Sequence, residues 1–133
     1  MIAVDTNVLV RILADDPEQP GQVAAARSLA SEARQVFVPT VVQVETVWVL
    51  ESGYRLSKQT IVEALDHLAL NQAFVQEDAD GCQRALDLFR GANADYADCL
   101  ILAGCRARDV PLHTFDKRLS KLRGAALVTP DVA

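Results

Sequence analysis

The sequence has few cysteines and no long apolar run. It contains three cysteines, Cys82, Cys99 and Cys105, which lack the close paired spacing of a zinc site. An odd set of this kind argues against a disulfide framework and favours a reducing compartment. No uninterrupted apolar stretch approaches the length needed to cross a bilayer, and no signal-peptide pattern follows Met1. We therefore expect a cytoplasmic protein that makes no membrane contact.

Aromatic residues and net positive charge are also scarce. Aromatics make up 5% of the chain, which leaves little material for a base-stacking platform. The formal net charge is −5, whereas phosphate contacts normally come from a surplus of lysine and arginine. The charge is unevenly distributed, however, because four basic residues crowd one short segment: Lys117, Arg118, Lys121 and Arg123. Nucleic acid therefore stays open as a partner.

Several phosphate-handling motifs are missing. Neither the dinucleotide-binding glycine pattern nor the P-loop occurs. The first predicted strand ends in Asp5-Thr6-Asn7, with no second aspartate two residues on and no adjacent acidic pair. Phosphotransferases of the haloacid-dehalogenase and receiver types need those acids, so these reaction classes are excluded.

The chain has the size and apolar content of one globular domain, with 133 residues of which 50% are hydrophobic. We expect a single domain over residues 1–133. Short apolar runs predict strands at 2–4, 35–38, 73–76, 111–115 and 125–128. Helical patterns lie at 6–14, 21–33, 40–52, 57–70, 79–91, 95–109 and 117–122, with Ser57 and Asp95 as N-caps and Gly53 as a C-cap. This alternation predicts an α/β fold, a three-layer α/β/α sandwich with a mostly parallel central sheet.

Two aspartates follow predicted strands directly. Asp5 comes after the strand at 2–4, and Asp116 comes after the strand at 111–115. The carboxyl edge of an open parallel sheet is where ligands bind, and the adjoining helix start offers amide donors. Taken alone, Asp5 is also explained as a helix cap and Asp116 as an ordinary loop acid.

Glu45 lies on a predicted helix face that is otherwise apolar. The residues three and four positions away are Val41, Val42, Trp48 and Val49. This pattern predicts a carboxylate among core side chains. Because an unpaired buried carboxylate is costly, we expect Glu45 to have a cation, a hydrogen-bonding partner or a raised pKa. A buried pairing with an arginine is the structural alternative.

Asp98 has the same character, with Ala94, Ile101 and Leu102 around it on the predicted helix. Asp95 lies one turn earlier on the same face, at a helix start where the macrodipole favours negative charge. A capping acid followed by a first-turn acid is the structural alternative, and it explains Asp95 better than Asp98. Asp95 is therefore expected to support Asp98.

These acids can converge at one edge of the sandwich. Ionised carboxylates within a few ångströms of one another need a compensating cation, and hard oxygen ligands select Mg²⁺ or Mn²⁺. Such an ion activates water and neutralises the charge that develops on a phosphodiester. The sequence therefore predicts metal-dependent phosphodiester hydrolysis, with four catalytic and metal-binding residues: Asp5, Glu45, Asp98 and Asp116.

Four short segments carry a family resemblance: AVDTNVL at 3–9, VETVWVL at 44–50, ADYADCLI at 94–101 and TFDK at 114–117. In this order and spacing the chain resembles the PIN-domain ribonucleases, specifically the VapC toxins of type II toxin-antitoxin pairs. The resemblance implies that the acidic quartet binds one or two Mg²⁺ or Mn²⁺ ions, with Asp5 and Asp98 as direct ligands. It implies supporting roles for Thr6, Asn7 and Thr114, the last orienting Asp116 or a metal-bound water.

The resemblance also implies partners: an RNA substrate, a second copy of the chain, and a cognate VapB-type antitoxin whose C-terminal segment obstructs the acidic site. The sequence itself gives the helix at 40–52 more apolar surface than one face can bury, which is consistent with an interface. The apolar residues concerned are Val41, Val44, Val47, Trp48 and Leu50.

Phosphate contacts are expected from four basic residues: Arg11, Lys117, Arg118 and Lys121. A solvated amphipathic turn is the alternative for the last three. Two other functions stay open: a PIN-like module that binds protein or RNA without catalysis, and a metal-dependent phosphohydrolase.

Overall fold

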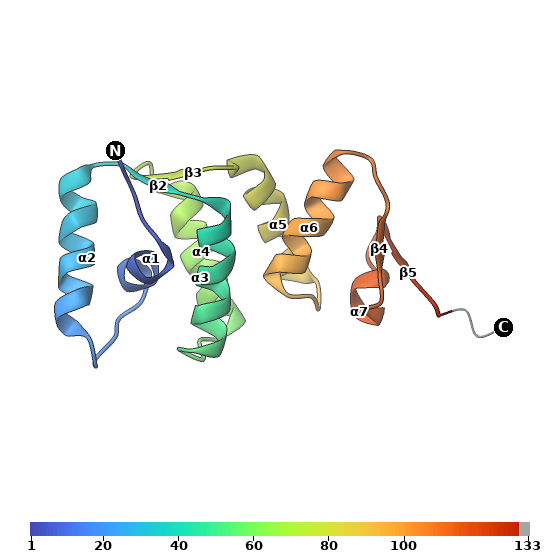
Figure 1. Cartoon of the computed structure of the whole chain (residues 1–133), viewed down its shortest axis with the longest axis horizontal. Helices are drawn as coiled ribbons and strands as arrows, with labels where there is room; N and C mark the ends of the chain where they lie inside the picture. The colour runs from blue at the N-terminus through green and yellow to red at the C-terminus, as the bar shows by residue number, and fades with distance from the viewer. Residues whose placement is uncertain (131–133) are drawn as a thin grey trace. The chain divides into compact units, whose positions relative to one another are not determined.

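The computed structural model describes residues 1–130 and divides the chain into two compact units. The N-terminal unit is Met1–Ala79 and the C-terminal unit is Asp80–Ala133. Figure 1 labels the helices and strands in chain order.

The N-terminal unit alternates strands and helices around a parallel sheet. Its elements are β1 (Ile2–Ala3), α1 (Thr6–Leu13), α2 (Pro20–Ala33), β2 (Val36–Val38), α3 (Thr40–Ser52), α4 (Lys58–Leu70) and β3 (Phe74–Gln76). The strand order is β1-β2-β3, and both pairs are parallel. Val36 and Val38 of the central strand are fully buried, as expected where helices cover a parallel sheet.

Helix α1 packs against both α2 and α3. Leu9 and Val10 of α1 are fully buried at these contacts, and each contributes about 1.5–3 kcal/mol by leaving water. The predicted caps are confirmed: Ser57 Oγ accepts from Thr60 N at 3.2 Å, and Gly53 N donates to Val49 O at 2.8 Å. These caps fix the start of α4 and the end of α3.

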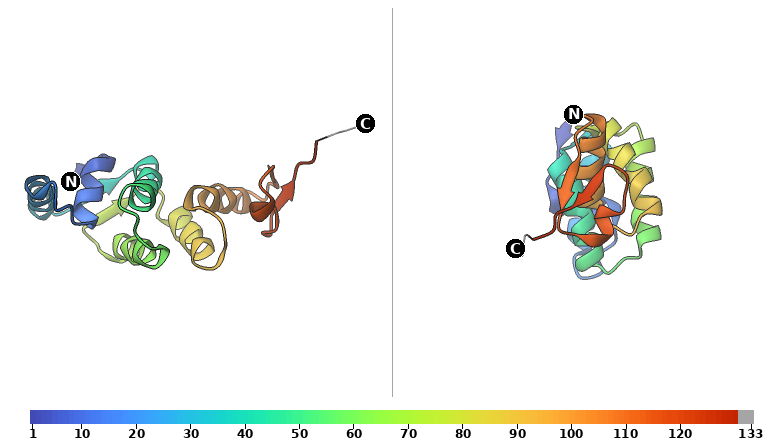
Figure 2. Two further views of the ribbon diagram at one scale, coloured as in Figure 1. Left: turned by 90° about the horizontal axis from the view of Figure 1, so that it is seen from below. Right: turned by 90° about the vertical axis from the view of Figure 1, so that its right-hand side faces the viewer.

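The C-terminal unit holds a helix pair and a second parallel sheet. Its elements are α5 (Ala79–Gly91), α6 (Tyr96–Ala107), β4 (Leu112–Thr114), α7 (Lys117–Ser120) and β5 (Ala125–Leu127). Figures 1 and 2 show α5 and α6 side by side. The rings of Phe89 and Tyr96 meet edge to face between them, with centroids 5.6 Å apart. Strands β4 and β5 pair in parallel.

The elements lie within two residues of their predicted bounds, and the α/β fold class with parallel strands is confirmed. The five strands of residues 1–130 form two sheets, one in each unit. The single domain over 1–133 stays a prediction, and its last three residues lie outside the described part. Among the helices of residues 1–130, none is both long and apolar enough to cross a membrane.

Candidate active site

Asp5 lies where β1 gives way to α1, and it is the N-cap of that helix. Its backbone is extended, and its Oδ1 accepts from Val8 N at 3.1 Å. Asp5 therefore caps the helix, as one of its two interpretations predicted, and the helix dipole favours the ionised carboxylate. Within residues 1–130 the second oxygen, Oδ2, makes no hydrogen bond. A carboxylate that caps with one oxygen still has the other for a ligand.

Asp5 also lines a cavity of about 510 Å³ between α1 and α2. The implied supporting residues lie in the first turn of α1, where Asn7 lines the same cavity and Thr6 is half-buried. Arg11, one turn further on, reaches this cavity as well. Polar groups of α1 therefore gather on one wall of a hollow beside Asp5.

Arg11 is held by neighbours that the sequence does not reveal. Its Nη1 donates to Asn7 O at 3.4 Å, and its Nη2 lies 4.0 Å from Asp16 Oδ2. Tyr54 OH donates to the same Asp16 oxygen at 2.7 Å, and this bond keeps the pKa of Asp16 below its usual range. Arg11 Nε is buried and has no hydrogen-bond partner in the described part of the chain. Asp16 and Tyr54 are 38 positions apart, so no local pattern predicts them.

Glu45 is exposed in α3, and the expectation of a buried carboxylate is wrong. The buried polar residues of α3 are instead Gln43 and Thr46, and Gln43 Oε1 accepts from Gln76 Nε2 at 3.0 Å. Because α3 is apolar nearly all round, the spacing of its apolar residues does not reveal which side faces the core. Val41 and Trp48 flank Glu45 and are 63% and 67% exposed, so the predicted surplus of apolar surface is confirmed.

Asp95 and Asp98 begin α6 as predicted. Asp95 is the N-cap, and its Oδ1 accepts from Asp98 N at 2.8 Å. Asp98 is half-buried, and burial raises its pKa above the usual range. The charge of Asp95, a side-chain hydrogen bond with it, and the charge of Asp116 raise that pKa further. Three acids of the C-terminal unit are thus electrostatic neighbours.

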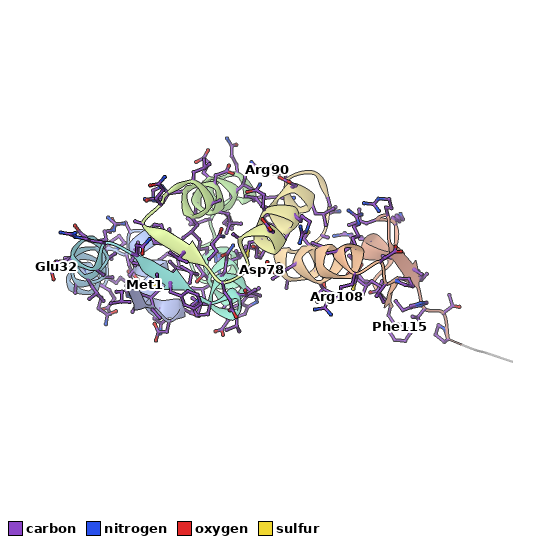
Figure 3. All side chains as sticks on the ribbon, turned by 90° about the horizontal axis from the view of Figure 1, so that it is seen from above. Met1, Glu32, Asp78, Arg90, Arg108 and Phe115 are labelled. Carbon is purple, nitrogen blue, oxygen red and sulfur yellow. The ribbon has the colours of Figure 1, made fainter. Side chains whose placement is uncertain are left out.

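Asp116 is fixed by hydrogen bonds on both sides. Its Oδ1 accepts from Arg118 N at 2.8 Å and from Leu119 N at 3.1 Å, which caps α7. Thr114 Oγ1 accepts from the backbone N of Asp116 at 3.0 Å. This bond holds the backbone of Asp116, and the orienting role implied for Thr114 stays a prediction. The preceding side chain, Phe115, is 72% exposed and is labelled in Figure 3.

Three basic residues after Asp116 were predicted to contact RNA. All three are exposed: Lys117, Arg118 and Lys121. Two of them belong to the single turn of α7 and the third caps its end. Their ammonium and guanidinium groups are therefore free to meet an anion from solvent. A solvated turn has the same geometry, so the assignment to RNA stays a prediction.

The structure groups the candidate acids by unit. Asp95 and Asp116 raise the pKa of Asp98 in the C-terminal unit, while Asp5 caps α1 and Glu45 lies in α3 of the N-terminal unit. Over residues 1–130, no three histidine, cysteine or acidic side chains are placed to hold a metal ion together. The convergence of the quartet therefore stays a prediction. The oxygen donors and the raised pKa of Asp98 fit a divalent cation, because uncompensated negative charge is what such an ion neutralises.

Two comparisons with known proteins agree with the geometry. The family model described as "PIN domain" matches residues 2–125. A protein named "VapC ribonuclease" from Aquifex aeolicus (strain VF5) is 26% identical over 132 residues, which cover 98% of this chain and 97% of that protein. Both matches extend through the N-terminal unit and into the second sheet of the C-terminal unit.

Proposed function

This chain belongs to the PIN domain family, and from that premise we propose that it is a metal-dependent endoribonuclease, the toxin of a type II toxin-antitoxin pair. The observation that carries the proposal is that Asp98 lies half-buried beside Asp95 and Asp116, where burial and the charges of these two acids raise its pKa. Structural capping needs no such concentration of negative charge. The name of the Aquifex relative supports ribonucleolytic cleavage as the reaction.

The metal would be held by Asp5, Glu45, Asp98 and Asp116, with Asp5 and Asp98 as direct ligands. When bound, Mg²⁺ or Mn²⁺ supplies a Lewis acid that activates water and neutralises charge on the phosphodiester. The family match spans both units, which supports the proposal that they form one domain with one acidic site.

The chain's own residues orient the site and bind the substrate. Thr114 and the amides of α7 hold Asp116 in one position, and the N-terminal amide of Val8 holds Asp5. The exposed cations Lys117, Arg118 and Lys121 bind RNA phosphates beside Asp116, where charge-assisted contacts position the backbone without reading bases.

Two protein partners belong to the proposal. An antitoxin of the VapB type would deliver a basic side chain to the acidic quartet, where it forms charge-assisted hydrogen bonds and excludes the ion. A second copy of the chain would cover the apolar residues of α3 that are exposed, Val41 and Trp48. Both surfaces carry the charge or the apolar character that these partners need.

Cleavage of RNA in Mg²⁺ by the wild-type protein and by Asp98→Asn tests the function. Asparagine keeps the size of the side chain and removes one charge, so we expect a folded protein whose cleavage falls by at least about a hundredfold. Asp80→Asn, at an exposed position early in α5, removes the same charge and should cleave normally. Equal cleavage by Asp98→Asn and wild type would overturn the proposal, and binding without cleavage by the wild type would favour the non-catalytic module.

A further inference from the structure

A cavity of about 650 Å³ in the C-terminal unit is lined by three arginines, each from a different segment. Arg84 comes from α5, Arg106 from α6 and Arg123 from the residues after α7. One acid, Asp87, also lines the cavity, and the side-chain amide of Gln83 donates to its Oδ1 at 3.1 Å. The cavity therefore has a surplus of positive charge in a chain whose net charge is −5.

Arg106 is fixed beside Arg123. Its Nε donates to the carbonyl oxygen of Arg123 at 2.7 Å. The next residue, Gly124, has a φ of +90°, and a Cβ there would lie only 3.3 Å from Arg106 Cγ. The chain after α7 thus passes close against the stem of Arg106, which holds its guanidinium in place.

The positive charges of this cavity are not balanced within the protein. Burial lowers the pKa of Arg106, and the charge of Arg123 lowers it further. Asp109 lines a smaller adjoining cavity with both arginines, but no ion pair to Arg84, Arg106 or Arg123 occurs in residues 1–130. Three arginines that line one cavity with a single carboxylate favour an anion from outside the chain.

We propose that Arg84, Arg106 and Arg123 form a second phosphate-binding site. This site binds a phosphate of the RNA at some distance from the phosphate that the acidic residues act on. The proposal rests on the proposed ribonuclease function, because RNA is the polyanion which that function brings to the protein. A guanidinium fork matches two oxygens of a phosphate, and such contacts fix the position of a backbone.

The position of Arg106 on α6 suits this role. Arg106 follows Asp98 by eight residues on the same helix, which is about 12 Å along its axis. A single strand covers that length with roughly four stacked nucleotides at about 3.4 Å each. One RNA chain can therefore contact Asp98 with its scissile phosphate and the arginine site with a phosphate a few nucleotides away.

The arginine site also divides the basic segment that follows Asp116. Arg123 turns to the cavity with α5 and α6, whereas Lys117, Arg118 and Lys121 do not line it. The segment thus presents two sets of cations to an anion, one directly after Asp116 and one at the far end of α6.

Binding of a short labelled oligouridylate by the full-length chain tests the site. The Asp98→Asn protein in chelator is used as background, so that the RNA stays intact. We expect Arg84→Gln and Arg123→Gln each to weaken binding roughly fivefold to tenfold at about 50 mM salt. Each should also lower the slope of log Kd against log salt by about 0.7, the value for one phosphate of a single strand.

Matched variants separate the site from general charge. Arg108, labelled in Figure 3, is exposed at the end of α6 and lines neither cavity, so Arg108→Gln should leave the slope unchanged. Arg106→Lys keeps the charge but loses the Nε hydrogen bond, and we expect it to bind more weakly than the parent.

The site is refuted if Arg84→Gln and Arg123→Gln behave like Arg108→Gln. Binding of polyglutamate, a model of an acidic protein, is measured with the same variants. If Arg84→Gln and Arg123→Gln lose polyglutamate binding but keep RNA binding, the cavity binds an acidic protein and the proposal is overturned. Cleavage in Mg²⁺ is measured separately on the Asp98-containing chain. Arginine-dependent binding without cleavage would support the phosphate site and count against the proposed ribonuclease function alone.

Discussion

The side chain of Asp95 accepts a hydrogen bond from the backbone N of Asp98 at 2.8 Å, and its negative charge raises the pKa of Asp98. The hydrogen bond from Asp98 N caps the start of α6, while the charge of Asp95 disfavours the ionised form of Asp98. Stability of the helix and electrostatic strain at the site come from the same residue. Removal of charge around Asp98 should therefore change stability in a definite direction.

Asp116→Asn should raise the melting temperature of the protein in chelator at neutral pH. Asparagine still caps α7, whereas the charge that disfavours ionised Asp98 is gone. Because the folded pKa of Asp98 is raised, its ionised form destabilises the fold above that pKa, and the penalty disappears as the pH falls through it. Thermal melts across pH should show the advantage of the variant shrinking in acid.

Glu45→Gln is the matched comparison for that measurement. Since Glu45 is exposed, the change should alter the free energy of unfolding by less than about 0.5 kcal/mol. A marked loss of stability in Asp116→Asn would contradict the electrostatic interpretation.

Tyr54→Phe should lower the free energy of unfolding at pH values above the pKa of Asp16 and have little effect in strong acid. The hydrogen bond from Tyr54 keeps that pKa low, so its stabilisation is present above the unfolded pKa and is lost as the pH falls through the folded pKa. Urea unfolding at neutral and acid pH measures the difference. A pH-independent loss would assign the role of Tyr54 to packing instead.

Thr114→Val should reduce RNA cleavage roughly tenfold to a hundredfold, the usual cost of removing a residue that orients a metal ligand. Valine has nearly the same shape but cannot accept from Asp116 N, which Thr114 Oγ1 now does at 3.0 Å. Thr114→Ser keeps the hydroxyl and should retain most activity. If serine and valine are equally impaired while both proteins stay folded, the hydroxyl does not orient Asp116.

The sequence predicts helices and strands well where its apolar residues follow a clear pattern or a capping residue marks a helix end. The strand β2 is a continuous apolar run between helical patterns, and capping residues such as Ser57 and Asp95 mark the starts of helices. The helix α3 is the exception, because valines on every side leave its orientation undetermined. The structure buries Gln43 and exposes Glu45, which the sequence pattern had placed among core side chains.

For the candidate site, too, the sequence predicts what depends on local signals and misses what depends on packing. Asp5 and Asp116 are candidates because each follows a strand, and Asp98 because it lies beside Asp95 on an otherwise apolar helix face; these are local signals. The hydrogen bond between Tyr54 and Asp16, which also lies beside Arg11, joins segments 38 residues apart in sequence. Such contacts depend on packing rather than on spacing, and the arginine cavity of α5 and α6 is of the same kind.

We propose that Asp5 and Asp98 bind the same metal ion, and stabilisation of the protein by Mg²⁺ tests this most directly. The rise in melting temperature on adding Mg²⁺ is measured for the wild type, Asp5→Asn and Asp98→Asn, since asparagine preserves the cap at Asp5 and the size at Asp98. We predict a clear rise for the wild type and none for either variant. A full rise in Asp5→Asn would contradict the claim, because the ion would then be held without the N-terminal unit's acid.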